Sequence, residues 1–370
     1  MKKILFLIHD LGQGGAEKVL VNLVNHMDRS KFDISVTVLF GGGVNEQFLA
    51  EDICFRAIFP KEFPGNSKFL KLMTPKQLHR LCVKEDYDIE VSYLEGPSAR
   101  VISGCENFKT KTICWIHSTF PSLETSSASF RNVKEAIRCY ESFNKIICVS
   151  NNVKEAFVNI FSTCNAIEVL YNVQDSNFIV SQSKLPVDHR WFCRDEISLI
   201  GIGSLKSVKA FDRLIRVQAD LRYENYPVHT YLLGKGPELN KLRKIADENG
   251  VSDTVSFLGY DINPYKYLAR SDLFICSSIS EGFSTAVTEA LILGVPVCTV
   301  EVSGMRELLG EDCEYGLITA NTEKDLYEGI KQLLDNPDMF SYYKTQAQIR
   351  GKKFSTEKTV KAIENLLLNM

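Results

Sequence analysis

The segment Ser280-Glu-Gly-Phe-Ser-Thr-Ala-Val-Thr-Glu-Ala-Leu-Ile-Leu-Gly-Val-Pro-Val297 places a polar turn and the beginning of a helix between two apolar runs. Those runs, 273–277 and 295–300, are short and continuous, which predicts strands buried on both faces. A strand, a turn, a helix and a second strand in this order indicate a parallel α/β sheet. Because free N–H groups and the helix dipole point outward where such a helix begins, the turn favours an anion.

Glu281 and Glu289 lie on either side of this turn, one before the predicted helix cap and the other about one turn inside the helix. Ser284 and Thr285 are suited to cap the helix. Two carboxylates in these places can bind hydroxyl groups on either side of a bound phosphate. A nucleotide-sugar presents its groups in that order, as sugar, diphosphate and ribose. Taken by themselves, however, two such glutamates more often make cap contacts or face solvent.

The alternation of apolar runs with amphipathic stretches continues along the 370 residues and predicts two doubly wound α/β domains. In the first half, the predicted strands are 4–8, 33–40, 89–94, 112–116 and 145–149, and the predicted helices are 16–27, 75–84 and 131–140. After a polar connector at 174–196, the predicted strands are 198–203, 228–234, 255–259, 273–277 and 295–300, and the predicted helices are 210–220, 237–248 and 283–293. We expect domains over 1–175 and 176–352, followed by a terminal helix in 353–370.

The composition excludes several classes of protein. A net charge of −3 and the absence of a recognition motif argue against a nucleic-acid partner. The eleven cysteines are odd in number, have no C-x-x-C spacing and sit mostly in apolar runs, which indicates free thiols in a reducing compartment. The apolar run at 4–8 is shorter than the core of a signal peptide, and no run is long enough to cross a bilayer. We therefore expect a cytoplasmic protein that is at most peripheral to a membrane.

The residues around the two carboxylates carry a resemblance to a known family. Glu281-Gly-Phe283 and Ala290-Leu-x-x-Gly-x-Pro-Val297 resemble the donor-site signature of retaining glycosyltransferases of family 4, or glycosyl transferases group 1, of the polysaccharide-assembly type. This resemblance implies the GT-B fold, in which two Rossmann-like domains face a cleft and the terminal helix crosses back onto the first domain. It also implies transfer of a sugar from a nucleotide-diphosphate donor with retention at the anomeric carbon, without a metal or other cofactor.

The same resemblance implies a role for each residue around the turn. Glu289 chelates the ribose hydroxyls, whereas Glu281 binds sugar hydroxyls and stabilises an oxocarbenium-like transition state. The N–H groups from Phe283 to Thr285 and the ammonium of Lys209 neutralise the departing diphosphate. The implied chemistry is front-face attack, in which the leaving phosphate takes the acceptor proton and no dedicated base is needed. A covalent intermediate on Glu281 is the alternative.

The stretch Gly201-Ile-Gly-Ser-Leu-Lys-Ser-Val-Lys209 resembles the Gly-Arg-Leu-x3-Lys-Gly segment of the family, in which the Arg and the Lys hold the donor diphosphate. Lys209 matches the lysine of that pattern. Ser204 stands at the position of the arginine, and Ala210 stands at the position of the second glycine. One cation of the pattern is therefore missing, and we hypothesise that Lys206 replaces it.

Glycine-bearing loops complete the predicted donor site. Gly14 and Gly15 belong to Gly12-x-Gly-Gly-Ala-Glu17, which lacks the third glycine of the dinucleotide fingerprint and resembles the first-domain loop of the family. A tight strand–helix turn that needs glycine φ angles explains this loop equally well. The other predicted donor-binding residues are Gly234, Gly259, Tyr260 and Gly282.

His117 and Glu95 each follow a predicted strand, at the end where open α/β folds bind ligands. Trp115-Ile-His-Ser118 resembles the family motif whose histidine lies near the transferred sugar. The resemblance implies that His117 binds a sugar hydroxyl and stabilises positive charge at the anomeric carbon. It also puts Glu95 on the acceptor side. For both residues, a purely structural role stays open.

One motif in the chain suggests a metal. Asp86-Tyr87-Asp88 matches the D-x-D of metal-dependent transferases, but it precedes a predicted strand and so lies at the wrong end of the sheet for a ligand. No other set of His, Cys and carboxylate residues has metal-ligand spacing along the chain. We therefore predict no metal site.

The stretch from Lys61 to Lys84 is basic and apolar at once. Its six basic residues alternate with phenylalanines, leucines and a methionine, a composition suited to the surface of an anionic bilayer. A solvated loop and helix face explains the same pattern. We carry peripheral contact with an anionic membrane as a prediction for 61–84.

Together these features favour a bacterial enzyme that moves a hexose or N-acetylhexosamine from a nucleotide-sugar, preferably a UDP-sugar. The acceptor would be a saccharide or lipid-linked saccharide in capsule, lipopolysaccharide or exopolysaccharide synthesis. Two alternatives stay open, namely a nucleotide-sugar 2-epimerase or hydrolase of the same fold, and a nucleotide-sugar-binding module without activity. An epimerase needs acid and base groups around C2, for which the chain shows no clear cluster, and Ser204 alone hints at lost catalysis.

Overall fold

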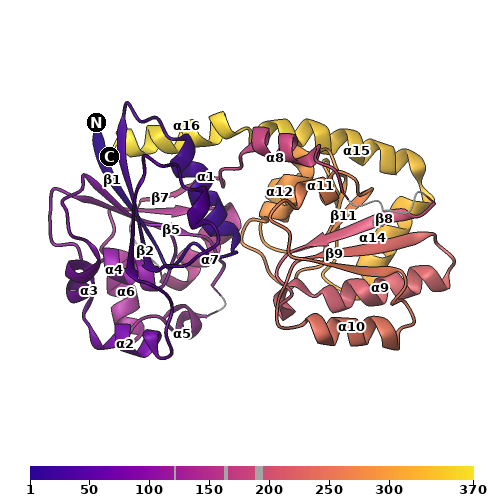
Figure 1. Cartoon of the computed structure of the whole chain (residues 1–370), viewed down its shortest axis with the longest axis horizontal. Helices are drawn as coiled ribbons and strands as arrows, with labels where there is room; N and C mark the ends of the chain where they lie inside the picture. The colour runs from indigo at the N-terminus through magenta and orange to yellow at the C-terminus, as the bar shows by residue number, and fades with distance from the viewer. Residues whose placement is uncertain (121, 162–165, 188–194) are drawn as a thin grey trace. The chain divides into compact units, whose positions relative to one another are not determined.

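The computed structural model describes residues 1–120, 122–161, 166–187 and 195–370. The chain divides into two compact units (Figure 1). Unit 1 comprises Met1–Gln174 together with Thr356–Met370, and unit 2 comprises Asp175–Ser355. The last segment of the chain therefore belongs to the first unit.

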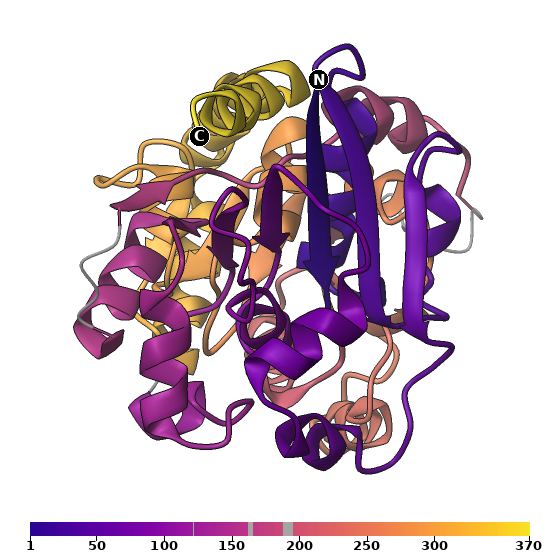
Figure 2. The same ribbon diagram turned by 90° about the vertical axis from the view of Figure 1, so that its left-hand side faces the viewer.

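Unit 1 is built on a seven-stranded sheet in which every pairing is parallel (Figure 2). The strand order is β3-β2-β1-β4-β5-β6-β7. The strands are β1 (Lys2–Ile8), β2 (Phe32–Phe40), β3 (Cys54–Phe59), β4 (Ile89–Ser92), β5 (Lys111–Ile116), β6 (Lys145–Cys148) and β7 (Ala166–Val169). The helices are α1 (Gly15–His26), α2 (Asn66–Leu72), α3 (Pro75–Cys82), α4 (Pro97–Ile102), α5 (Leu123–Ser126), α6 (Val133–Glu141), α7 (Asn151–Phe161) and α16 (Thr356–Leu368), with a 3₁₀ turn η1 (Glu46–Phe48).

The terminal helix α16 packs against α1 of unit 1 through an apolar stripe. Val360, Ile363 and Leu367 are buried at the helical spacing of three and four residues. Polar contacts flank the stripe, because the Lys2 ammonium donates to the Leu367 carbonyl at 3.0 Å and the Asp28 N–H donates to the Glu364 carboxylate at 2.6 Å. The helix predicted at the end of the chain thus completes unit 1.

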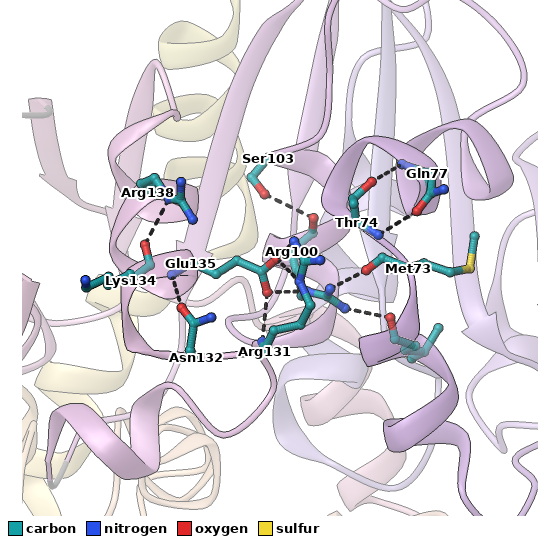
Figure 3. A network of polar contacts seen from close by, with 11 residues as sticks. Met73, Thr74, Gln77, Arg100, Ser103, Arg131, Asn132, Lys134, Glu135 and Arg138 are labelled. Carbon is teal, nitrogen blue, oxygen red and sulfur yellow. Dashed lines mark hydrogen bonds and ion pairs between the residues drawn. The ribbon is translucent and has the colours of Figure 1, made fainter.

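A buried ion pair fastens the helices on one side of unit 1 (Figure 3). The guanidinium of Arg100, on α4, donates to the Glu135 carboxylate of α6 at 2.9 Å. Its other nitrogens donate to the carbonyl of Leu70, at 2.7 Å, in the last turn of α2, and to the carbonyl of Met73, the residue that follows α2. A helix end needs such partners because its final carbonyls have none within the helix. Arg100 thereby fixes α2, in the basic and apolar stretch 61–84, to the rest of unit 1.

Unit 2 repeats the plan with a six-stranded parallel sheet of order β10-β9-β8-β11-β12-β13. The strands are β8 (Ile197–Ile202), β9 (Val228–Leu233), β10 (Val255–Gly259), β11 (Leu273–Cys276), β12 (Val297–Val300) and β13 (Leu317–Thr319). The helices are α8 (Ser176–Ser183), α9 (Phe211–Tyr223), α10 (Leu239–Glu248), α11 (Tyr265–Leu268), α12 (Thr285–Ile292), α13 (Met305–Leu309), α14 (Glu323–Asp335) and α15 (Pro337–Gly351), with 3₁₀ turns η2 (Ser207–Lys209) and η3 (Lys352–Phe354). The prediction of doubly wound α/β units is confirmed.

The stretch predicted as a polar connector, 174–196, is not a connector throughout. It begins with α8, whose first turn is capped by Asp175 accepting the N–H of Phe178 at 2.9 Å. Only Ile179 of this helix is fully buried. Because the helix has almost no buried face, its sequence lacks the amphipathic pattern that would predict it. Residues 188–194 of the same stretch lie outside the part of the chain that the structure describes.

The strand orders fix where each unit can bind a ligand. The order reverses between β1 and β4 in unit 1 and between β8 and β11 in unit 2. At such a switch point, the loops that leave the carboxyl ends of the two central strands diverge and open a crevice. In unit 2, those two loops carry Lys209 and Glu281.

Candidate functional site

The loops after β8 and β11 are bound to each other along their backbones. The Ser277 hydroxyl donates to the carbonyl of Lys209 at 2.8 Å, and the N–H of Ile279 donates to the carbonyl of Val208 at 2.8 Å. The switch point of unit 2 is therefore a fixed frame for the side chains that these loops carry.

Lys209 and Glu281 form an ion pair within this frame. The Lys209 ammonium lies 2.6 Å from Oε1 of Glu281, and the Ser278 hydroxyl donates to the same oxygen at 2.6 Å. Both charged side chains are partly exposed, at 22% for Lys209 and 12% for Glu281. The resemblance assigned the two residues to different parts of a donor, and in this structure they hold each other.

The helix that follows, α12, presents its N-terminus at the same edge. Ser284 is its N-cap and accepts the Val287 N–H at 3.4 Å. Glu289 lies in the second turn and is 4% exposed, and the Tyr265 hydroxyl donates to its Oε1 at 3.2 Å. A carboxylate this deeply buried needs polar partners, which Tyr265 helps to supply. The predicted order of Glu281, helix start and Glu289 is present, and Tyr265 is a partner that the sequence did not reveal.

The residues that depart from the family pattern, Ser204 and Ala210, lie on the loop that follows β8. Ser204 and Lys206 are both exposed on the loop after β8. Ala210 stands where the pattern has glycine and adopts the left-handed conformation, with φ 46° and ψ 43°. That conformation is one that glycine adopts readily and alanine only at a cost of about 1–2 kcal/mol.

Gly234 lets two neighbouring loops approach closely. Gly234, after β9, has φ 153°, and a Cβ at this position would collide with the Gly203 carbonyl. The Gly234 N–H donates to the carbonyl of Gly259 at 2.8 Å, next to the exposed Tyr260. The ammonium of Lys235 lies over the Tyr260 ring, 4.9 Å from its centre. Sequence reasoning missed Lys235, whose only signal was a basic residue between two glycines after a strand.

At the switch point of unit 1, the loop after β1 carries Gly14 and Gly15. Gly14 is the N-cap of α1 with φ −69°, so no glycine φ angle is required there. A Cβ at Gly14 would instead collide with the carboxylate of Glu17, which folds back over the loop. Burial raises the pKa of Glu17. The glycine makes room for an acidic side chain that the sequence analysis did not single out.

His9 and Asp10, directly after β1, form a second pair that the sequence analysis overlooked. His9 Nδ1 lies 2.7 Å from Asp10 Oδ2, and the other Asp10 oxygen accepts the Gly12 N–H at 2.6 Å. The hydrogen bond to Asp10 raises the pKa of His9, and the same bond lowers the pKa of Asp10. The only signal was the position of two polar residues at the end of an apolar strand.

The two predicted acceptor residues meet in unit 1. Glu95 follows β4, and its Oε2 accepts the backbone N–H of His117, which follows β5, at 2.9 Å. Burial raises the pKa of Glu95. Burial also lowers the pKa of His117 to about 3, and its Nε2 is shielded from solvent without a hydrogen-bond partner. His117 is therefore a neutral imidazole at ordinary pH and is unsuited to act as an acid.

The structure also places the possible metal ligands. Asp88, in the D-x-D motif, precedes β4, as the sequence predicted, and its carboxylate accepts the backbone N–H of Lys3 at 2.7 Å. Spacing along the chain revealed no other set, but among the described residues His79, Glu90 and Cys105 come together, with one potential ligand atom of each within 4.8 Å of the others. The nine cysteines in the described ranges are free, whereas Cys164 and Cys193 lie outside them.

Comparison with known families decides the class of the protein. The family model described as Glycosyltransferase Family 4 matches residues 13–178, and the model described as Glycosyl transferases group 1 matches residues 192–350. The chain belongs to the family 4 glycosyltransferases. The first family model matches unit 1 and the second matches unit 2, so together they cover most of this glycosyltransferase.

Relatives of the glycosyltransferase come from several organisms. The N-acetylgalactosamine-N,N'-diacetylbacillosaminyl-diphospho-undecaprenol 4-alpha-N-acetylgalactosaminyltransferase of Campylobacter jejuni is 29% identical over 377 residues and covers 100% of both chains. The lipopolysaccharide core biosynthesis glycosyltransferase LpsE of Rhizobium meliloti is 24% identical over 82% of this chain and 81% of its own.

The solved structure of HepE from Anabaena in complex with UDP-glucose has the same fold as the glycosyltransferase, with a TM-score of 0.80, 20% identity and 100% coverage of both chains. The predicted GT-B fold class is thereby confirmed. Among the residues that the structure describes, none of the helices combines the length and the apolar character needed to span a bilayer.

Proposed function

We propose that this glycosyltransferase moves a hexose or N-acetylhexosamine from a UDP-sugar to a saccharide or lipid-linked saccharide, in the assembly of a bacterial surface polysaccharide. Transfer would retain the anomeric configuration and need no metal. The observation that carries the proposal lies at the switch point of unit 2, where Lys209 pairs with Glu281 on the loops before α12 and Glu289 lies in the second turn of that helix. The names of the relatives support it, since one acts on a diphospho-undecaprenol saccharide and the Anabaena protein binds UDP-glucose.

The proposed donor site uses fixed charge where other transferases use a metal. Glu289 chelates the ribose hydroxyls, and the N–H groups at the start of α12 receive the diphosphate. Lys209 then leaves Glu281 for the diphosphate, because a dianionic group attracts the ammonium more strongly than one carboxylate does. The freed Glu281 carboxylate binds a hydroxyl of the sugar and stabilises the positive charge that develops at the anomeric carbon.

The acceptor side of the proposal concerns unit 1. A neutral His117 offers a hydrogen bond to a sugar hydroxyl without adding a positive charge where one is developing. Helix α2 supports a contact with lipid, because Leu72 is 81% exposed and Phe69 is 41% exposed on a helix that also carries Lys68 and Lys71. This segment would hold the enzyme at an anionic bilayer while it takes a lipid-linked acceptor.

Binding of nucleotides tests the donor site directly. Thermal-shift titration with UDP, GDP, ADP and their sugars, in EDTA, should show stabilisation by the uridine series. Glu289→Gln should weaken UDP binding about 10–100-fold, since a charged hydrogen bond contributes about 1.5–3 kcal/mol. Tyr265→Phe keeps the carboxylate and is the matched control, with a smaller loss expected. Stabilisation that requires Mn²⁺ would contradict the proposal.

Product analysis tests the reaction. UDP release that depends on a saccharide acceptor indicates transfer, release without acceptor indicates a hydrolase, and binding without release indicates an inactive module. The NMR coupling of the anomeric proton in the product distinguishes retention from inversion. Sedimentation with anionic and neutral vesicles tests the membrane contact, which the double variant Lys68→Glu/Lys71→Glu should weaken on anionic vesicles only.

A further inference from the structure

We propose that His79, Glu90 and Cys105 bind a Zn²⁺ ion that fastens α3 to the sheet of unit 1. The three residues come from α3, from β4 and from the loop that follows α4. One ligand atom of each lies within 4.8 Å of the other two, and His79 Nε2 is 2.7 Å from Glu90 Oε2. Their positions along the chain, 79, 90 and 105, are too irregular to suggest a site, so only the fold reveals it.

The donor atoms select the metal. An imidazole nitrogen, a thiolate sulfur and a carboxylate oxygen suit Zn²⁺, whereas Mg²⁺ and Ca²⁺ prefer oxygen alone. With Zn–ligand bonds of about 2.0–2.3 Å, tetrahedral ligand atoms lie roughly 3.3–3.8 Å apart. The present 2.7 Å contact between His79 and Glu90 is a hydrogen bond, so the two side chains would separate by about half an ångström as the ion replaces the proton.

The surroundings hold the ligands in place and leave a way in. Glu90 is 2% exposed and lies on a strand, which makes it the rigid member of the set. His79 and Cys105 are partly exposed, so a water molecule can fill the fourth position of a three-ligand zinc site. An ion can therefore reach the site from solvent.

The loop that carries Cys105 is held against α3 by two further contacts. A Cβ on Gly104 would collide with the Pro75 carbonyl at the start of α3, so the absence of a side chain lets the loop lie directly on the helix. Next to the thiol, the Glu106 carboxylate pairs with Lys76 and, at 3.1 Å, with Arg80, both on α3. These contacts keep Cys105 beside His79 before any ion arrives.

The position of the site in the sheet indicates its role. Glu90 is the second residue of β4, whereas Glu95 and His117 follow the carboxyl ends of β4 and β5. The ion would thus lie away from the edge that carries the candidate acceptor residues. It would instead stabilise α3, which is part of the stretch 61–84 to which we assign the membrane contact.

Cobalt binding tests the proposal, because a Co²⁺–thiolate bond gives a charge-transfer absorption band. The full chain, stripped with a chelator and kept reduced, should bind one Co²⁺ with that band and release it to Zn²⁺. Cys105→Ser should abolish the band. His79→Gln and Glu90→Gln should weaken binding by more than the 10–100-fold typical of an outer-shell partner. Cys54→Ser, at an exposed thiol of β3, is the matched control and should keep the band.

Stability gives a second readout. Zn²⁺ should raise the melting temperature of the wild type and of Cys54→Ser, but not that of Cys105→Ser. Gly104→Ala keeps all three ligands and should bind more weakly, because its loop cannot lie on Pro75. A wild type that shows neither the band nor the shift, or a band that persists in Cys105→Ser, would overturn the proposal. The turnover number of Cys105→Ser, measured in EDTA, should equal that of the wild type, because the proposed ion is structural and takes no part in catalysis.

Discussion

Lys209 and Glu281 form an ion pair with each other, whereas the proposed mechanism assigns Lys209 to the diphosphate and Glu281 to the sugar. Each would be stabilised by the other in the absence of donor, which keeps two partly buried charges paired until a diphosphate arrives. The sequence indicated both residues through a family pattern and gave no sign that they touch. Contacts between side chains on separate loops depend on the register of β8 and β11, which no local pattern encodes.

Removal of the Lys209 ammonium should damage the reaction more than it damages the fold. Lys209→Met should lower kcat by about 100–1,000-fold, the usual result of losing one group that stabilises charge in a transition state. The steady-state rate of UDP release in the presence of acceptor measures this loss of kcat. Lys206→Met is the matched comparison on the same loop. If Lys206 replaces the missing arginine, this variant also loses donor affinity and turnover, and unchanged values would refute that replacement.

His117 should make the free energy of unfolding depend on pH at acid pH. Burial lowers its pKa to about 3 from an ordinary value of 6.5, so between these pH values the unfolded chain binds a proton that the folded chain does not. The stability that neutral His117 contributes is therefore complete above about pH 6.5 and falls with pH, with a slope near 1.4 kcal/mol per unit. Urea unfolding of His117→Asn should show a flatter acid limb.

His79 supplies the control of opposite sign. Burial lowers its pKa, but hydrogen bonds to Cys105 and Glu90 outweigh burial and raise the pKa to about 9. In the metal-free protein, its contribution is complete below about pH 6.5 and is lost as the pH rises through 9. His79→Gln should flatten the alkaline limb and leave the acid limb unchanged. An acid limb that is equally steep in His117→Asn and in the wild type would show that His117 does not titrate as stated.

Among the elements, the strands that the sequence failed to predict are β3, β7 and β13. All three lie at edges of their sheets. β3 begins exposed, β7 alternates between exposed and partly buried residues and β13 is only partly buried, so these three lack the continuous apolar run that marks β1, β8 or β11. The remaining edge strand, β10, keeps a recognisable apolar pattern and was predicted over 255–259. Central strands and the site loops that follow them were predictable for the same reason. The helix within 174–196 was missed because almost none of its side chains is buried.

The cap of α12 should matter for binding as well as for stability. Ser284→Ala removes the acceptor for the Val287 N–H and should cost about 1 kcal/mol of unfolding free energy. It should also weaken UDP binding, since a frayed first turn presents its N–H groups poorly. Thr322 caps α14 by accepting the N–H of Asp325 at 3.1 Å, so Thr322→Ala is a matched control. It should lose similar stability with unchanged UDP affinity, and equal losses of affinity in the two variants would contradict the assignment.

At the scale of the whole chain, unit 1 is assembled from two segments that 181 residues separate, namely Met1–Gln174 and Thr356–Met370 with Asp175–Ser355 between them. The last helix α16 must therefore find unit 1 after unit 2 has been made. The sequence of α16 predicted a helix, but its packing onto the first domain was expected only from the family resemblance. Long-range docking of this kind depends on the three-dimensional surface of β1, α1 and their neighbours, which no periodicity along α16 specifies.

The docking of α16 should make a mutation near the end of the chain act on its beginning. Leu367→Ala, at a fully buried position, should cost about 2–5 kcal/mol and lower the stability of unit 1. Leu333→Ala, equally buried on α14, should lower the stability of unit 2 by a similar amount. Hydrogen exchange in urea, followed on peptides from β1 and β4 and from β9 and β12, assigns each loss to a unit. Faster exchange of β9 and β12 in Leu367→Ala, with β1 and β4 unchanged, would refute this view, because α16 would then stabilise the wrong unit.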